Sequence, residues 1–165
     1  MKRAGLHLMN LLIACFVVTS SCSQTKSTGN FPATDSYVGS TPCDSLIKSL
    51  LQIPSITKCD FLKWDLSLQK SSPDSFHLTV FYGESQPNTN GFINGGKKIV
   101  VNGKYAINNG SGAIPHMKIY YLYGDKFMSP LLLIEMDSNI LHFADANKNF
   151  IVGNGGWGYV LNRLQ

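Results

Sequence analysis

Three glycines near the end of the chain have the spacing of a turn that binds dinucleotides. Gly153, Gly155 and Gly158 match the pattern G-x-G-x-x-G, in which glycines let the backbone approach a pyrophosphate. That pattern also requires a following helix and an acidic residue about 20 positions later. Seven residues follow Gly158, and Tyr159 and Val160 among them favour a strand. We therefore expect a tight connection before the last strand and no bound cofactor.

A short polar segment partly matches a calcium-binding loop. Asp145, Asn147 and Asn149 stand at loop positions 1, 3 and 5, whose side chains bind the ion in an EF-hand. Position 6 needs glycine and is Phe150, and position 12 needs glutamate and is Gly156. The segment is therefore predicted to be a polar turn between strands.

The histidines and methionines that follow the N-terminal segment do not have the spacing of a metal motif. The patterns H-x-H and H-E-x-x-H do not occur in the sequence. Thioether and imidazole groups suit a cuprous ion, so a scattered copper-binding set is the alternative. It would draw on His116, Met117, Met128, Met136 and His142. Because their spacing is irregular, we predict no metal site and expect His142 to be a hydrogen-bonded strand residue.

Residue sets for covalent or acid–base catalysis are not recognisable either. The sequence has no G-x-S-x-G, and Ser111 in the segment GSG has no evident histidine and aspartate partners. Asp60 and Asp65 lie near one predicted strand, but Asp65 belongs to its polar face. We therefore predict that the protein is not an enzyme, and a hydrolase or redox enzyme is the less favoured class.

The first residues of the chain have the composition of a bacterial lipoprotein signal. Lys2 and Arg3 precede an apolar stretch over residues 8–18, which as a helix spans about 16 Å, roughly half of a hydrocarbon core. Residues 19–21 are small and Cys22 follows, which resembles a lipobox. We expect cleavage before Cys22 and attachment of lipid to it. An ordinary secretory signal cut at the same place is the alternative.

The chain is predicted to have three parts: a signal peptide over 1–21, a flexible polar tether over 22–36 and a single domain over 37–165. Ser23 follows the lipidated cysteine, where aspartate would suggest retention in the inner membrane. We therefore expect an anchor in the outer membrane, on its periplasmic or surface face. Removal of the signal leaves 12 basic and 10 acidic residues, scattered singly, so nucleic acid is not an expected partner.

Two cysteines, Cys43 and Cys59, remain once the signal and the lipidated residue are set aside. They stand 16 positions apart, whereas thiols that share a metal or a redox function are usually separated by two residues. An even pair in an oxidising compartment predicts a disulfide. Two free thiols, or a soft-metal or redox pair, are the alternatives.

One helix is predicted, over residues 41–54. Thr41 can cap it, Pro42 suits the first helical position, and Asp44 stands where a capping box has its acid. Apolar residues then recur at steps of three and four, which predicts a single buried face. They are Cys43, Leu46, Ile47, Leu50 and Leu51. Pro54 is expected to end the helix, whose apolar face packs on the core.

After Cys59 the apolar period changes to two, which indicates strands. Residues 61–69 and 76–83 each place alternate side chains on one apolar face and predict an antiparallel hairpin. A second hairpin is expected over 97–107, with a type I′ turn at Asn102 and Gly103. Further strands are expected over 117–124, over 130–145 with a hinge at Asp137 and Ser138, over 149–153 and over 157–163.

This pattern predicts a mainly β protein: an antiparallel lipocalin-like β-barrel, or a strongly curved sheet, of about eight strands with one short N-terminal helix. Closure into a barrel would remove exposed sheet edges. Aromatic and imidazole side chains on the expected inner faces and at the barrel ends are candidates to line a ligand site. They are Trp64, Phe76, Tyr82, His142 and Trp157.

The segment YVGSTPCD has the order Y-x-G-x-x-P-C at Tyr37, Gly39, Pro42 and Cys43. It resembles the start of the NlpE-like lipoproteins, the copper-resistance and envelope-stress family. The resemblance implies an envelope lipoprotein with a lipocalin-like barrel, linked to metal or surface-stress response. The family has a second cysteine three positions after the first, where this sequence has Leu46, so no metal or redox residues are carried over. The chain also looks like lipoproteins of the Bacteroidetes type.

Together these features predict a membrane-anchored envelope lipoprotein that acts as a binding or stress-sensing module. The alternative is a lipocalin-like carrier whose apolar interior holds a small hydrophobic ligand. The expected partners are the membrane, through the lipid at Cys22, and either such a ligand or another envelope protein. A copper-binding protein and a hydrolase are less favoured.

Overall fold

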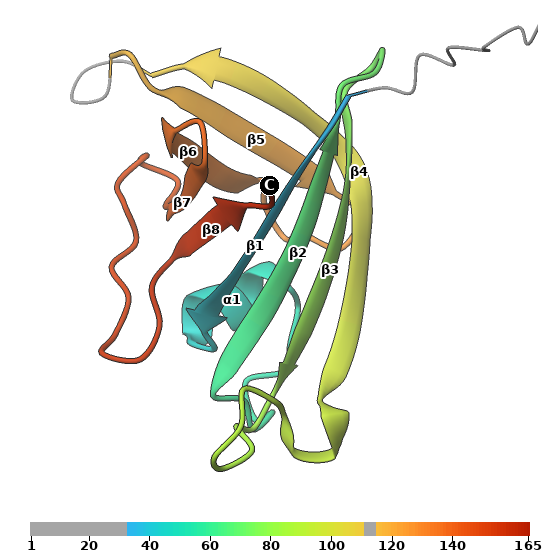
Figure 1. Cartoon of the computed structure of the whole chain (residues 1–165), viewed down its shortest axis with the longest axis vertical. Coiled ribbons are helices and arrows are strands. Elements are labelled where there is room, and N and C mark those ends of the chain that lie inside the picture. Colours follow the sequence, from blue (N-terminus) through green and yellow to red (C-terminus); the bar gives the residue numbers. More distant parts are fainter. Residues whose placement is uncertain (1–32, 111–114) are drawn as a thin grey trace, which may run out of the picture. The chain divides into compact units, whose positions relative to one another are not determined.

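Consecutive strands pair antiparallel and the last strand pairs with the first, which closes a barrel (Figure 1). The computed structural model describes residues 33–110 and 115–165. Its strands are β1 (Thr34–Pro42), β2 (Phe61–Gln69), β3 (Ser75–Gly83), β4 (Lys97–Asn109), β5 (Lys118–Gly124), β6 (Leu131–Asp137), β7 (Ile140–Ala144) and β8 (Val160–Arg163). A helix, α1 (Ser45–Leu50), follows β1, and a 3-10 turn, η1 (Ile93–Gly95), precedes β4. The predicted antiparallel lipocalin-like barrel is confirmed.

The N-terminal part of the chain, including Cys22, lies outside the described residues, as does Ser111. β1 begins at Thr34, so residues 34–36, which were assigned to the tether, belong to the barrel wall. The nine-residue β1 was not predicted as a strand. Its sequence contains glycine and proline, and it is held extended by β2 on one side and β8 on the other.

No helix among the described residues is long and apolar enough to span a membrane.

The predicted hairpin of β2 and β3 is confirmed, and its apolar face lies in the barrel core. Alternate residues of both strands are buried, and each fully buried leucine contributes about 2 kcal/mol relative to an exposed one. The buried set is Leu62, Trp64, Leu66, Leu68, Phe76, Leu78, Val80 and Tyr82. Trp64 also donates its indole N–H to the hydroxyl of the buried Thr41 at 2.8 Å. This bond satisfies both polar groups inside the core.

The predicted turn at Asn102 and Gly103 is wrong, because β4 runs through both residues as a single strand. Neither residue has the positive φ that a type I′ turn requires. The first part of β4 pairs with β3 and its last part with β5. A Cβ at position 103 would overlap the carbonyl oxygen of Tyr123 and lie 2.8 Å from the ring of Phe76. Glycine is therefore needed at this position for close approach of neighbouring strands and not for a reversal of the chain.

The helix is shorter than predicted and begins later. Pro42 ends β1, and Asp44 is the N-cap, whose carboxylate accepts the N–H of Ile47 at 3.0 Å. The helix ends at Leu50, before Pro54, and Gln52 has a φ of 55°. Ile47 and Leu50 are buried as expected, but Leu46 is 43% exposed.

The C-terminal strands also differ from the prediction. The turn between β6 and β7 lies at the expected hinge. Residues 149–153, predicted as a strand, do not form one, and only Phe150 among them bridges to Ala144. β8 begins at Val160, later than the predicted position 157. The glycine-rich segment is a connection in which the side chain of Asn154 accepts the N–H groups of Gly156 and Trp157.

Candidate functional site

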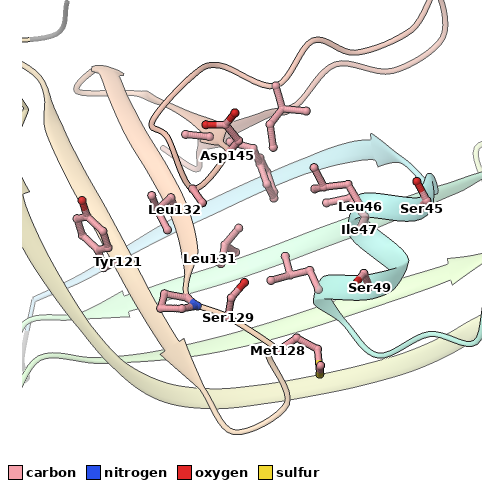
Figure 2. Close-up of a pocket in the computed structure, with 16 residues that line it drawn as sticks. Ser45, Leu46, Ile47, Ser49, Tyr121, Met128, Ser129, Leu131, Leu132 and Asp145 are labelled. Carbon is pink, nitrogen blue, oxygen red and sulfur yellow. The ribbon is translucent and has the colours of Figure 1, made fainter. Parts of the chain in front are cut away.

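An apolar cavity of about 520 Å³ lies between α1, the start of β6 and the end of β7. Figure 2 shows Leu46 and Ile47 of α1 on one side and Leu131 and Leu132 of β6 on the other. Most of its lining is apolar, chiefly Leu46, Leu50, Met128, Leu131, Leu132 and Phe143. Its polar groups are Ser45, Ser49, Tyr121, Ser129 and Asp145. The combination of a hydrophobic wall with a few polar groups is typical of a small-molecule site.

The N-cap of α1 fixes the helical wall of the cavity to the rest of the barrel. One oxygen of Asp44 caps the helix, and the other accepts a hydrogen bond from the hydroxyl of Tyr159. Tyr159 is 1% exposed, and burial, followed by the bond to Asp44, raises the pKa of its phenol. The phenol therefore stays protonated and keeps donating this bond at ordinary pH.

The C-terminal end of α1 is attached as well. The carbonyl of Leu50 accepts the N–H of Met128 at 3.2 Å, which ties the helix to the segment between β5 and β6. Lys48 donates to the carbonyls of Ser55 at 3.2 Å and Thr57 at 2.8 Å. Both ends of the helix are thus held, so the wall of the cavity is a fixed surface.

The disulfide between Cys43 and Cys59 is confirmed, with the two Cα atoms 5.7 Å apart. The disulfide joins the residue after β1 to the segment before β2. The loop that the disulfide closes therefore contains α1. The N–H of Cys43 also donates to the carbonyl of Asp60 at 3.1 Å. The two free thiols and the metal or redox pair considered from the sequence are thereby excluded in this structure.

Asp145 is the charged residue of the cavity lining. One oxygen of its carboxylate accepts the N–H groups of Asn147 at 2.9 Å and Asn149 at 2.8 Å, and the other accepts the amide of Asn149 at 3.2 Å. The backbone bond from Asn149 is the main cause that lowers the pKa of Asp145. This segment therefore forms a polar turn, as predicted. The carboxylate of Asp145 stays ionised.

None of the five residues predicted to line a ligand site belongs to this cavity. Three of them stack or pack edge-on against other rings, with the centroids 4.9 Å apart for Trp64 and Phe143, 6.1 Å for Phe76 and Phe127 and 5.1 Å for Trp157 and Phe61. Tyr82 borders a second, more polar hollow of about 420 Å³. Trp64 and Phe76 belong to the packed core of the barrel, whereas the cavity of about 520 Å³ lies beside α1.

His142 packs its ring against Phe150, with centroids 4.9 Å apart, and its Nδ1–H donates to the carbonyl of Phe143 at 2.8 Å. Of the methionines in the alternative copper set, Met128 lines the cavity, Met117 packs beside Ile119, and Met136 is exposed. Among the described residues, no three histidine, cysteine, aspartate or glutamate side chains gather where they could hold a metal ion.

A cluster of polar side chains lies at the end of the barrel where β1 begins. The hydroxyl of Tyr120 donates to Glu135 at 2.7 Å, and the Lys118 ammonium lies 2.9 Å from the other oxygen of that carboxylate. Tyr105 is close by, with its ring centroid 6.1 Å from that of Tyr120, and burial raises its pKa to about 12. These bonds give both oxygens of the partly buried Glu135 carboxylate a partner.

The fold and the cavity define a lipocalin-like barrel, a closed antiparallel wall of strands β1 to β8 with a hollow beside α1. No protein-family model matches this chain, and no curated protein or solved structure does either.

Proposed function

We propose that this protein is a lipid-anchored envelope lipoprotein whose barrel binds a small hydrophobic ligand in the cavity beside α1. The cavity carries the proposal, because its volume of about 520 Å³ falls within the usual range for small-molecule sites, roughly 300 to 1,000 Å³. Its lining has one charged residue and no histidine, lysine or cysteine, which favours binding without catalysis.

The envelope location is proposed from the sequence. The basic start, the short apolar stretch and the small residues before Cys22 support export and lipid attachment. The resemblance to NlpE-like lipoproteins at Tyr37, Gly39, Pro42 and Cys43 supports a binding or stress-sensing role in the outer membrane. In this proposal the ligand is what the anchored barrel carries or senses.

A bulky side chain on α1 is expected to block the cavity. Ser49→Phe places a ring among the lining residues, so affinity for the neutral fluorescent probe N-phenyl-1-naphthylamine is expected to fall at least about tenfold. The measurement is a fluorescence titration of the purified barrel. Ser55→Phe, the same change at an exposed residue outside the lining, is the control and is expected to keep the affinity of the unchanged protein.

Two results would count against the proposed ligand site. The first is that the unchanged protein does not bind the probe. The second is equal affinity in the two phenylalanine variants, provided that thermal melts show both to be folded. Either result would remove the cavity as the place of binding.

Lipid attachment is expected to depend on Cys22 alone. Cys22→Ser is expected to move the protein from the membrane fraction to the soluble fraction, because the change removes the thiol that would carry lipid. Cys15→Ser, a matched change within the apolar stretch, is expected to leave the protein in the membrane fraction. Mass spectrometry of the mature N-terminus then measures the modification, and an unmodified Cys22 would refute the anchor.

A further inference from the structure

We infer that the cavity prefers amphiphiles with a cationic head group over those with a carboxylate, and that Asp145 sets this preference. The inference rests on the proposed ligand binding and adds to it the chemical class of the ligand. It follows from the distribution of charge and free hydrogen-bonding groups around the cavity.

The negative charge at the cavity is held in a fixed place. Asp145 follows directly after β7, and three hydrogen bonds from Asn147 and Asn149 orient its carboxylate. Those bonds lower the pKa of Asp145, so it is ionised at neutral pH. Asp44, next to the lining residue Ser45, places a second carboxylate at the start of the helical wall.

No basic residue stands among the lining residues to balance this charge. The ammonium of Lys48, on the same helix, is engaged with the carbonyls of Ser55 and Thr57. Lys148 lies on the turn after Asp145 and is not part of the lining. A carboxylate head group would therefore approach Asp145 without a counter-charge, and repulsion would weaken its binding.

Three serine hydroxyls also line the cavity: Ser45 and Ser49 on α1 and Ser129 before β6. Within the described part of the chain their Oγ atoms make no hydrogen bond to protein groups, so they are available to the polar end of a ligand. The apolar walls between these serines would take the hydrocarbon part. The site thus combines an apolar body, neutral hydrogen-bonding groups and one fixed anion.

The test compares three amphiphiles with the same dodecyl chain: dodecyltrimethylammonium, dodecanol and dodecanoate. Each displaces N-phenyl-1-naphthylamine from the protein at low salt, with the two ionic amphiphiles below their micelle concentrations and dodecanol below its solubility limit. We expect the ammonium to bind tightest and dodecanoate weakest, with about tenfold between them, as expected for unit charges several ångströms apart near a solvated rim. Raising NaCl from about 10 mM to about 1 M is expected to reduce this difference in the unchanged protein.

Asp145→Asn removes the charge but retains an acceptor oxygen for the turn. It is expected to bring the affinities of the ammonium and dodecanoate close to the affinity of the same variant for dodecanol. Asp65→Asn, the same change on the exposed face of β2, is the control and is expected to leave the order intact. The salt series on the unchanged protein tests the charge effect even if Asp145→Asn fails to fold.

The outcomes separate the inference from the proposed function. If dodecanol binds but the three head groups do not differ, or dodecanoate binds tightest, the inference is overturned and ligand binding stands. If the order persists in folded Asp145→Asn, Asp145 is not the residue that sets it, and the inference is overturned. If neither dodecanol nor the probe binds, the proposed function itself fails.

Discussion

Gly39→Ala is expected to lower the free energy of unfolding by about 3 kcal/mol, because it forces atoms together where the barrel closes. Gly39 pairs with Trp64 of β2 on one side and with Leu161 of β8 on the other. A Cβ at this position would overlap the carbonyl oxygen of Val160 and lie 2.8 Å from a side-chain carbon of Leu161. Urea unfolding followed by circular dichroism measures the change.

Gly155→Ala is the matched control for this prediction. A Cβ at position 155 would have no heavy atom within 4 Å, and Gly155 does not have the left-handed φ that disfavours alanine. Its effect is expected to stay within about 0.5 kcal/mol. Equal stability of the two alanine variants would show that β8 can move away from β1 without cost. That result would contradict the close packing of β8 against Gly39.

Removal of the disulfide is the second large expected effect. The double variant Cys43→Ser and Cys59→Ser is expected to lose roughly 3 kcal/mol, since the bond restricts the unfolded chain across a sequence separation of 16. The loss is expected to fall on the cavity as well, because α1 lies within the loop that the bond closes. Denaturant unfolding measures stability, and titration with N-phenyl-1-naphthylamine measures the cavity.

Reduction with dithiothreitol provides the internal comparison. The unchanged protein is expected to fall to the stability of the double variant when reduced, whereas the double variant is expected to be insensitive to the reagent. A loss below about 1 kcal/mol in both experiments would show that packing of Ile47, Leu50 and Leu51 holds the loop without the bond.

The sequence predicted a strand correctly where the alternation of apolar and polar residues within that strand is enough to determine its structure. Leu62, Trp64, Leu66 and Leu68 alternate with exposed or half-buried residues, and a strand with one buried face is the structure that this period allows. β1 lacks such a pattern, and its conformation depends on its two partners, β2 and β8, of which β8 is far from it in the sequence.

Tertiary contacts also overrode a strong local signal. Asn102 and Gly103 form the dipeptide most typical of a hairpin turn, yet β4 passes straight through them. The reason lies outside the segment, in the carbonyl of Tyr123 and the ring of Phe76, which come close to the glycine. A pattern confined to one strand does not contain that information.

The cavity was the least predictable part of the structure. Its lining comes from α1, the segment around Ser129, β6 and the residues after β7, and no short motif joins these segments. The sequence did contain one indication, the apolar stripe of the helix, which was predicted to pack fully on the core. Leu46 belongs to that stripe but stays partly exposed, because it faces the hollow.

The position of β8 has a consequence for how the protein is made. This strand of four residues closes the barrel through three residue pairs with β1 and three with β7. It is also the last of the eight barrel strands in chain order, so it is synthesised after its two partners. Until Arg163 is in place beside Tyr37, β1 and β7 remain bare edges that can pair with other polypeptides. Any factor that shields a nascent chain from its neighbours would have to act on these two edges until β8 has been synthesised and has paired with them.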